Sequence, residues 1–110
     1  MRRFLLGLSL VAVSLVGVSS TASARQDRHV IIQNDSGYDI VAVYASNVGT
    51  DSWEEDMLGD LVLRDGRSAR FNIDDGSGYC RYDIKLVFED GDVIYRRAAN
   101  VCKLGVLRIN

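Results

Sequence analysis

The strongest constraint on the fold is a strict alternation of apolar and other residues along the segment 80–89. The apolar positions, which fall at every second residue, are Cys80, Tyr82, Ile84, Leu86 and Phe88. The positions between them are mostly polar or charged. Successive side chains of a strand point to opposite faces of its sheet, so the pattern indicates a strand with one face packed on a core.

Shorter patterns of the same period cover most of the remaining chain. They occupy residues 30–33, 38–45, 61–63, 68–73, 93–98 and 101–109, with turn residues between them. The turn chemistry at 34–37 predicts a hairpin between the first two. The chain has no proline and no long helical period. About seven short strands in one small domain predict an all-β fold, an antiparallel β-sandwich, with a small open β-barrel as the alternative.

The first 24 residues have the pattern of a signal peptide. Arg2 and Arg3 precede an apolar run over residues 4–18, and small residues with an Ala-x-Ala site follow it. This run of about fifteen residues is shorter than the roughly twenty of a membrane-spanning helix, which favours cleavage after Ala24 over an uncleaved anchor. The sequence thus predicts a signal peptide over 1–24 and a single β domain over 25–110. We expect export to the periplasm, or to the medium, without stable membrane insertion after cleavage.

The charge of the mature chain argues against a nucleic-acid partner. The formal net charge of −2 becomes −4 on cleavage, because the first 24 residues hold two arginines and no acidic residue. Basic residues recur at Arg64, Arg67, Arg70, Arg96 and Arg97, each among apolar or acidic neighbours. This spacing is more typical of a solvated strand face than of a phosphate-binding track.

Two cysteines, Cys80 and Cys102, predict a disulfide. An even pair in a small exported domain is most simply oxidised, and closing a loop of about 23 residues would contribute roughly 3 kcal/mol. The hairpin turn around Gly91 leaves two geometries open. A three-residue turn centred on Gly91 would place position 80 opposite 102, whereas a two-residue turn would place it opposite 101 and require a bulge near Asn100.

The segment 46–60 breaks the alternation. Ser52 and Glu55 fit a capping box, which predicts a short helical turn with Trp53, Met57 and Leu58 on one side. Trp53 lies among acidic residues. It is a candidate ligand-binding residue, as an exposed anchor for a partner, or else it closes the open end of the sandwich.

Two acidic loops are the other candidate ligand-binding positions. Asp74 and Asp75 precede Gly76, and Asp90 and Asp92 flank Gly91. Hard oxygen ligands beside flexible turns suit Ca²⁺, although neither loop matches an EF-hand. The alternative is that these residues are solvated and serve only the turns.

The sequence offers no catalytic constellation. Its single histidine, His29, lies near the mature N-terminus, and both cysteines are expected to be oxidised. We therefore expect no enzyme activity, and no residue pattern calls for a cofactor.

The order of several motifs resembles that of a group of small uncharacterised exported bacterial proteins. The motifs are Asp51-Ser52-Trp53, Leu58-Gly59, Leu61, Leu63, Gly66-Arg67-Ser68, Cys80-Arg81-Tyr82-Asp83-Ile84, Asp90-Gly91 and Asn100-Val101-Cys102. Glu54 departs from the glycine usual after the tryptophan in that group. The resemblance implies a bacterial periplasmic or secreted setting and assigns no site.

Together these features predict a non-catalytic exported binding module for an unknown protein or small ligand of the cell envelope. The alternative is a calcium or small-ligand binder that uses the acidic loops.

Overall fold

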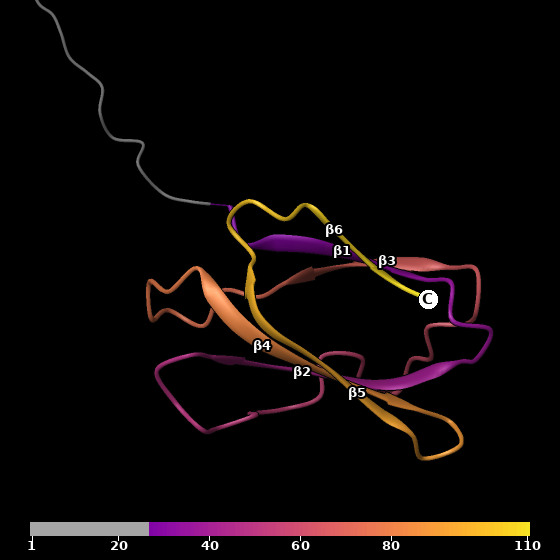
Figure 1. Ribbon diagram of the computed structural model, residues 1–110. Helices are drawn as coiled ribbons and strands as arrows, with labels where there is room; N and C mark the ends of the chain where they lie inside the picture. Colours follow the sequence, from indigo (N-terminus) through magenta and orange to yellow (C-terminus); the bar gives the residue numbers. More distant parts are fainter. Residues whose placement is uncertain (1–26) are drawn as a thin grey trace, which may run out of the picture.

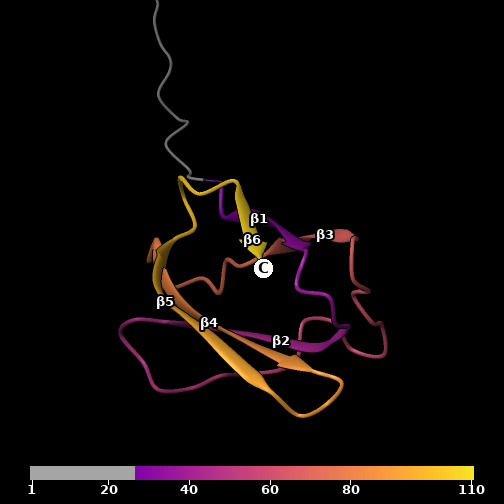
Figure 2. The ribbon, with the colours of Figure 1, turned by 45° about the vertical axis from the view of Figure 1, so that its right-hand side comes forward.

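The computed structural model describes residues 27–110, which form six strands and no helix. The strands are β1 (His29–Asn34), β2 (Ile40–Asn47), β3 (Ser68–Asn72), β4 (Arg81–Phe88), β5 (Val93–Asn100) and β6 (Val106–Ile109). They build two sheets, with strand orders β3-β1-β6 and β2-β4-β5, and the sheets lie in two layers (Figure 1; Figure 2). The predicted all-β sandwich is confirmed.

The predicted signal peptide over 1–24 lies outside the described residues. Within residues 27–110 the structure contains no helix with the length and apolar content that a membrane crossing needs.

The sandwich differs from the expected one in strand number and direction. The segment 61–63 contributes a single bridge, Ile40 to Leu63, rather than a strand, so the described part has six strands instead of about seven. β1 and β6 run parallel, with Ile31 opposite Val106 and Asn34 opposite Ile109. The other three strand pairs are antiparallel. An alternating pattern specifies which face is buried but not the direction of a neighbouring strand.

The expected hairpin between the first two strands is wrong, because the chain passes from one sheet to the other between them. Asn34 directs this passage from a fully buried position. Its Nδ2 donates to the Tyr38 oxygen at 2.7 Å and to the Leu63 oxygen at 2.9 Å. Its Oδ1 accepts from the Ser36 nitrogen at 3.1 Å and from Ser36 Oγ at 2.6 Å. A turn signal therefore marked the bend without specifying which sheet the next strand joins.

The core lies between the two sheets. The β4 alternation is confirmed, since Tyr82, Ile84, Leu86 and Phe88 are all buried. They pack with buried residues of the first sheet and of the connections, namely Val30, Ile32, Phe71, Ile73, Leu58, Leu63, Val101 and Ile109. The opposite face of β4 is consequently available for other contacts.

The β4–β5 hairpin combines a three-residue turn with a bulge. The Phe88 nitrogen donates to the Asp92 oxygen at 2.8 Å, and Gly91 has a φ of 92°, a conformation that glycine adopts without strain. Further along, the register shifts by one residue between the Tyr82 and Ile84 pairs. Ala98 has a φ of 53° at this shift, which marks a bulge in β5.

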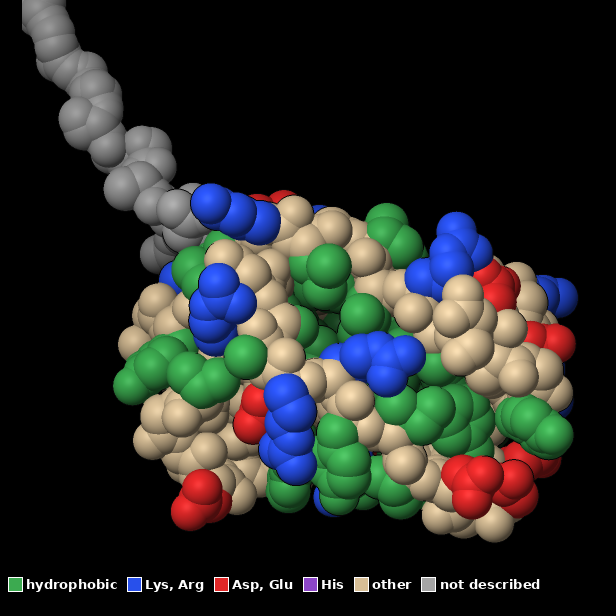
Figure 3. Space-filling view, in the orientation of Figure 1, with side chains coloured by type: hydrophobic (Ala, Val, Ile, Leu, Met, Phe, Trp, Pro, Cys, Tyr) green, Lys and Arg blue, Asp and Glu red, His purple; other side chains and the backbone are tan. Residues whose placement is uncertain are grey.

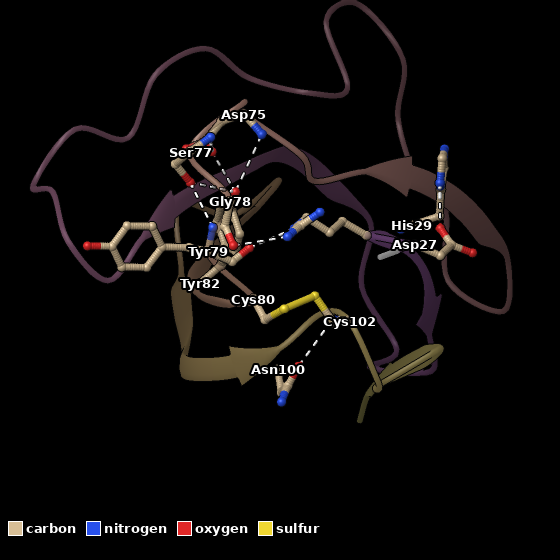
Figure 4. The surroundings of a disulfide bond; sticks show 11 residues. Asp27, His29, Asp75, Ser77, Gly78, Tyr79, Cys80, Tyr82, Asn100 and Cys102 are labelled. Carbon is tan, nitrogen blue, oxygen red and sulfur yellow. Dashed lines mark hydrogen bonds and ion pairs between the residues drawn. A yellow bond between two sulfur atoms is a disulfide. The ribbon is translucent and has the colours of Figure 1, made fainter. Parts of the chain in front are cut away.

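The predicted disulfide between Cys80 and Cys102 is confirmed, with Cα atoms 5.3 Å apart (Figure 4). The Val101 nitrogen donates to the Cys80 oxygen at 2.8 Å, so position 80 faces 101 rather than 102. The bulge at Ala98, and not one near Asn100, provides this offset. Asn100 Oδ1 accepts from the Cys102 nitrogen at 3.1 Å and holds the bridge end of the loop.

Candidate functional site

The loop between β2 and β3 crosses the outer face of the second sheet. In Figure 1 its first part, in magenta, runs on the side of β2 and β4 that faces away from the first sheet. The predicted helical turn is wrong: residues 52–55 are not helical, and Glu54 has a φ of 56°. The backbone N–H of Ser52 instead donates a hydrogen bond to Thr50 Oγ1, with the nitrogen 3.3 Å from the oxygen.

Asp56 attaches the end of this loop to the edge of β2. Its Oδ1 accepts from the Val43 nitrogen and from the Leu58 nitrogen, both at 2.9 Å. The Met57 nitrogen donates to the Val43 oxygen at 2.8 Å. Met57 and Leu58 thereby enter the core, whereas Trp53 lies on the other side of the sheet. The expectation that these three side chains share one side is wrong.

Trp53 packs on a row of side chains that crosses all three strands. Lys85 of β4 lies opposite Tyr44 of β2 and Tyr95 of β5. Lys85 Nζ is 4.7 Å from the Tyr44 ring centroid and 5.0 Å from that of Trp53. The Trp53 and Tyr95 centroids are 6.0 Å apart. Trp53 is half-buried on this outer face, so it does not close the end of the sandwich.

The β5 bulge adds an ion pair to the same surface. Asp83 of β4 lies opposite the bulge and accepts hydrogen bonds from Arg97 and from Ala98. Its Oδ1 accepts from the Ala98 nitrogen at 2.8 Å, and its Oδ2 accepts from an Arg97 guanidinium nitrogen at 3.2 Å. The Arg97 guanidinium carbon is 4.5 Å from the Tyr95 ring centroid. The bulge thus holds Arg97 over the aromatic row, which is a use of bulges found at functional sites.

These groups surround an open hollow of about 270 Å³. Its lining consists of Ser46, Thr50, Asp51, Trp53, Asp83, Tyr95 and Arg97. We call these seven residues the Trp53 hollow. Within the described part of the chain the Asp51 side chain makes no hydrogen bond or ion pair, so it is an uncommitted acceptor. The hollow is therefore lined mainly by polar atoms, both donors and acceptors, and lies beside the aromatic row.

Asp75 of the first predicted acidic loop is engaged within the protein. Its Oδ1 accepts from Tyr82 Oη at 2.6 Å and from the Ser77 nitrogen at 3.0 Å, and its Oδ2 accepts from Asn47 Nδ2 at 2.8 Å. Partial burial opposes ionisation, but the hydrogen bonds from Ser77, Tyr82 and Asn47 outweigh it and hold the pKa of Asp75 well below its usual value. Figure 4 shows this loop beside the disulfide.

The remaining acidic candidates also shape turns. Asp74 Oδ1 accepts from the Gly76 nitrogen, and Asp90 Oδ1 accepts from the Asp92 nitrogen, each at 3.0 Å. The two loops flank opposite ends of β4. Among residues 27–110 no three acidic, histidine or cysteine side chains gather as a metal site would require. Calcium binding stays a prediction that the geometry does not strengthen.

The sequence prediction found Trp53 but missed the residues around it. The alternation along β4 already placed Asp83 and Lys85 on the outer face. Nothing local indicated that Tyr95 and Arg97 would join them, since that depends on the β4–β5 register and its bulge. The single histidine, His29, lies in the other sheet, where its Nδ1 is 2.8 Å from Asp27 Oδ1 (Figure 4).

Charged side chains are interspersed over the face seen in Figure 3, where Lys and Arg atoms stand apart among apolar and uncharged ones. Comparisons of the chain with protein-family models, with curated proteins and with solved structures found no match. The resemblance to a group of exported bacterial proteins accordingly stays a prediction.

Proposed function

We propose that the mature chain is an exported, non-catalytic binding module, and that it binds its partner at the outer face of β2-β4-β5 through the Trp53 hollow. The observation that carries this proposal is the aromatic row of Tyr44, Trp53 and Tyr95 on the sheet face turned away from the core. Tyr95 is 45% exposed on this face, so a large aromatic side chain lies at the surface and not in the core.

The composition of this surface supports binding. Trp, Tyr and Arg are the residue types that dominate the energetics of protein interfaces. Here they are held on strands and on a loop that Asp56 fixes to β2, so little conformational freedom is lost when a partner is bound. A scaffold that positions a loop in this way is a common arrangement for recognition sites.

Export is supported by two features. The segment 1–24 has the pattern of a signal peptide, and the Cys80–Cys102 disulfide is of a kind that persists in oxidising compartments. Fractionation of the producing cells with N-terminal sequencing tests this part: we expect a chain that begins at Arg25 outside the cytoplasm. A full-length chain in the cytoplasm would contradict it.

The binding surface is tested by retention of the purified mature protein on cell-envelope material. Trp53→Ala with Tyr95→Ala should abolish saturable retention. Tyr38→Ala is the matched control, because Tyr38 is 58% exposed and is not part of the Trp53 hollow. Equal retention of the double variant and the control would refute the proposed surface. Circular dichroism of each variant confirms that the fold is kept.

A further inference from the structure

We propose that the free edge of β3 binds the C-terminal end of an extended peptide whose last residue is apolar. The peptide lies along β3 as an added strand, its last side chain enters the hollow beside the start of β3, and its terminal carboxylate binds Arg67. This surface shares no residue with the Trp53 hollow, so the inference goes beyond the proposed function.

The hollow beside the start of β3 is lined mainly by apolar side chains. It has a volume of about 350 Å³, and we call its lining residues the β3 hollow, namely Leu58, Leu61, Val62, Leu63, Arg64, Arg67, Ser68 and Ala69. The volume lies at the lower end of the range of roughly 300–1,000 Å³ for ligand sites, which is room for one large side chain. Leu61 is 71% exposed, more than any other large apolar residue that the structure describes.

The apolar residues of the β3 hollow are held in place by backbone hydrogen bonds. The Leu61 nitrogen donates to the Leu58 oxygen at 3.0 Å, and Leu63 and Ile40 exchange two bonds of 2.9 Å between their backbone nitrogens and oxygens. The side chains of Leu58 and Leu63 are buried in the core. Leu61 and Val62 are therefore fixed at the surface between two anchored residues, so little conformational freedom is lost when a ligand covers them.

The charged groups of the β3 hollow favour an anion. Its lining holds two arginines and no acidic residue, although the mature chain is acidic overall. Arg64 pairs with Asp39 at 3.2 Å, whereas among residues 27–110 the Arg67 side chain has no acidic partner. Asp65 uses its Oδ1 to accept from the Gly37 nitrogen at 2.9 Å. Because a guanidinium group binds a carboxylate through two parallel hydrogen bonds, Arg67 is an available carboxylate-binding group.

β3 has one unpaired edge. It lies at the end of its sheet that is turned away from β6 (Figure 2). The Asn34 nitrogen donates to the Arg67 oxygen and the Ile73 nitrogen donates to the Arg28 oxygen, both at 2.9 Å, so the odd-numbered residues of this segment bond to β1. The even-numbered ones direct their backbone N–H and C=O groups away from β1, namely Ser68, Arg70 and Asn72. Such an edge is a template for an added strand.

These three features lie in the order that the end of a peptide requires. A strand that pairs antiparallel with β3 runs from the Asn72 end to the Ser68 end, so its C-terminus arrives at the β3 hollow, of which Ser68 is part. Arg67 directly precedes Ser68 in the chain and so lies beyond the last paired residue. In this mode of recognition backbone pairing provides affinity, and a pocket for a side chain provides specificity.

Other ligands use only part of this surface. An acyl chain with a carboxylate would fill the β3 hollow and leave the edge of β3 unpaired. An internal peptide segment would bring no terminal carboxylate to Arg67. Two copies of this chain paired antiparallel through β3 would place their Arg70 residues, at the middle of the strand, opposite one another, which is unfavourable for like charges. The C-terminus of a different protein uses all three features.

Binding is measured by the fluorescence anisotropy of an N-terminally labelled pentapeptide, Ser-Thr-Val-Thr-Leu with a free carboxylate, on titration with the mature protein. We expect saturable binding with a Kd below about 1 mM. Two comparison peptides should each bind at least about tenfold more weakly. One has a C-terminal amide and lacks the charge for Arg67, and the other ends in serine and lacks the apolar side chain for the β3 hollow.

Backbone pairing is tested by N-methylation of the peptide, which leaves the protein unchanged. Two isomers carry the same number of methyl groups on alternate residues, in one register or in the other. One isomer blocks the N–H groups that face β3, whereas the other blocks those that face solvent. We expect the isomers to differ in affinity by about tenfold.

Matched protein variants locate the carboxylate. Arg67→Gln should weaken binding of the free-carboxylate peptide about tenfold and leave binding of the amidated peptide unchanged. Arg70→Gln removes the same charge from β3 itself, outside the β3 hollow, and should change the affinity less than twofold. Trp53→Ala with Tyr95→Ala should leave it unchanged.

Four results would overturn the inference: no saturable anisotropy change at millimolar concentration, equal binding of the amidated peptide, equal binding of the two methylated isomers, or displacement of the labelled peptide by octanoate at a lower concentration than by the unlabelled peptide. The last result would assign the β3 hollow to a simple amphipathic anion. Each of these leaves the Trp53 hollow untouched, because its variants involve other residues. Binding of this strength is released on washing, so retention on envelope material still reports the Trp53 hollow.

Discussion

Replacing Asn34 by alanine should cost more stability than any other polar-to-alanine change in the described strands. Asn34 is fully buried where the chain leaves the first sheet for the second. Its side chain makes four hydrogen bonds, two to backbone oxygens of Tyr38 and Leu63 and two from Ser36. Alanine removes all four, while the Leu63 oxygen keeps its bond from the Ile40 nitrogen.

The magnitude follows from these contacts. A hydrogen bond contributes about 1 kcal/mol net. The bond to Leu63 is buried and the other three are partly exposed, so we expect a total loss of about 3 kcal/mol in the free energy of unfolding. Asn72→Ala is the matched control. Its Oδ1 accepts a single exposed bond, from the Asp74 nitrogen, and its loss should stay below about 1 kcal/mol.

Urea unfolding of the mature protein with the disulfide intact measures both values. With a slope of about 1 kcal/mol per molar urea for a domain of this size, Asn34→Ala should lower the midpoint by about 3 M. If Asn34→Ala and Asn72→Ala shift the midpoint equally, Asn34 does not hold the passage between the sheets, and the reasoning fails.

Three further predictions concern other parts of the molecule. Reduction of the Cys80–Cys102 disulfide should add two hydrogens to the intact mass and lower the free energy of unfolding by about 3 kcal/mol; an unchanged mass would contradict the bridge. Because folding lowers the pKa of Asp75, its contribution to stability is present above its usual pKa of 3.8 and is lost as pH falls below that value. Asp75→Asn should therefore lower stability at neutral pH and flatten its decline in acid, and an acid unfolding curve identical to that of the unchanged protein would contradict this. Millimolar Ca²⁺ should raise the melting temperature if the loops around Asp75 and Asp90 bind it, and identical curves in Ca²⁺ and in chelator would reject the calcium alternative.

Local patterns predicted the parts of the fold that depend on burial alone. The alternation from Tyr82 to Phe88 is a property of one strand and its core, and the structure follows it residue by residue. The disulfide was predictable from the even number of cysteines together with the expected export of the chain. The register around the disulfide was not predictable, because it depends on a bulge at Ala98, and alanine is not a residue type that indicates a bulge.

Features that depend on distant segments could not be read in this way. The turn residues after Asn34 indicated a bend, and only the bonds to Tyr38 and Leu63 determine that the chain changes sheets there. Likewise, β6 joins β1 in parallel from the far end of the chain.

The candidate site has the same origin. Trp53 was visible as a tryptophan in an irregular acidic segment, but its function in the fold depends on where the loop lies. The cap predicted at Ser52 would have placed it beside Met57. Instead, the Val43 nitrogen donates to Asp56 Oδ1 and the Val43 oxygen accepts from the Met57 nitrogen. With the loop held in this way, Met57 packs against the core and Trp53 lies on the outer face. The site is therefore assembled by tertiary contacts, which a single sequence does not display.

The central claim is that binding takes place at the Trp53 hollow, and amide chemical shifts of the labelled mature protein test it most directly. Spectra are recorded before and after addition of soluble envelope components from the producing cells. We predict that the shifted signals cluster at the Trp53 indole N–H and at the amides of Asp51, Lys85, Tyr95 and Arg97. Shifts confined to residues 74–78 or 89–92, with the Trp53 indole signal unmoved, would contradict the account and favour the acidic loops.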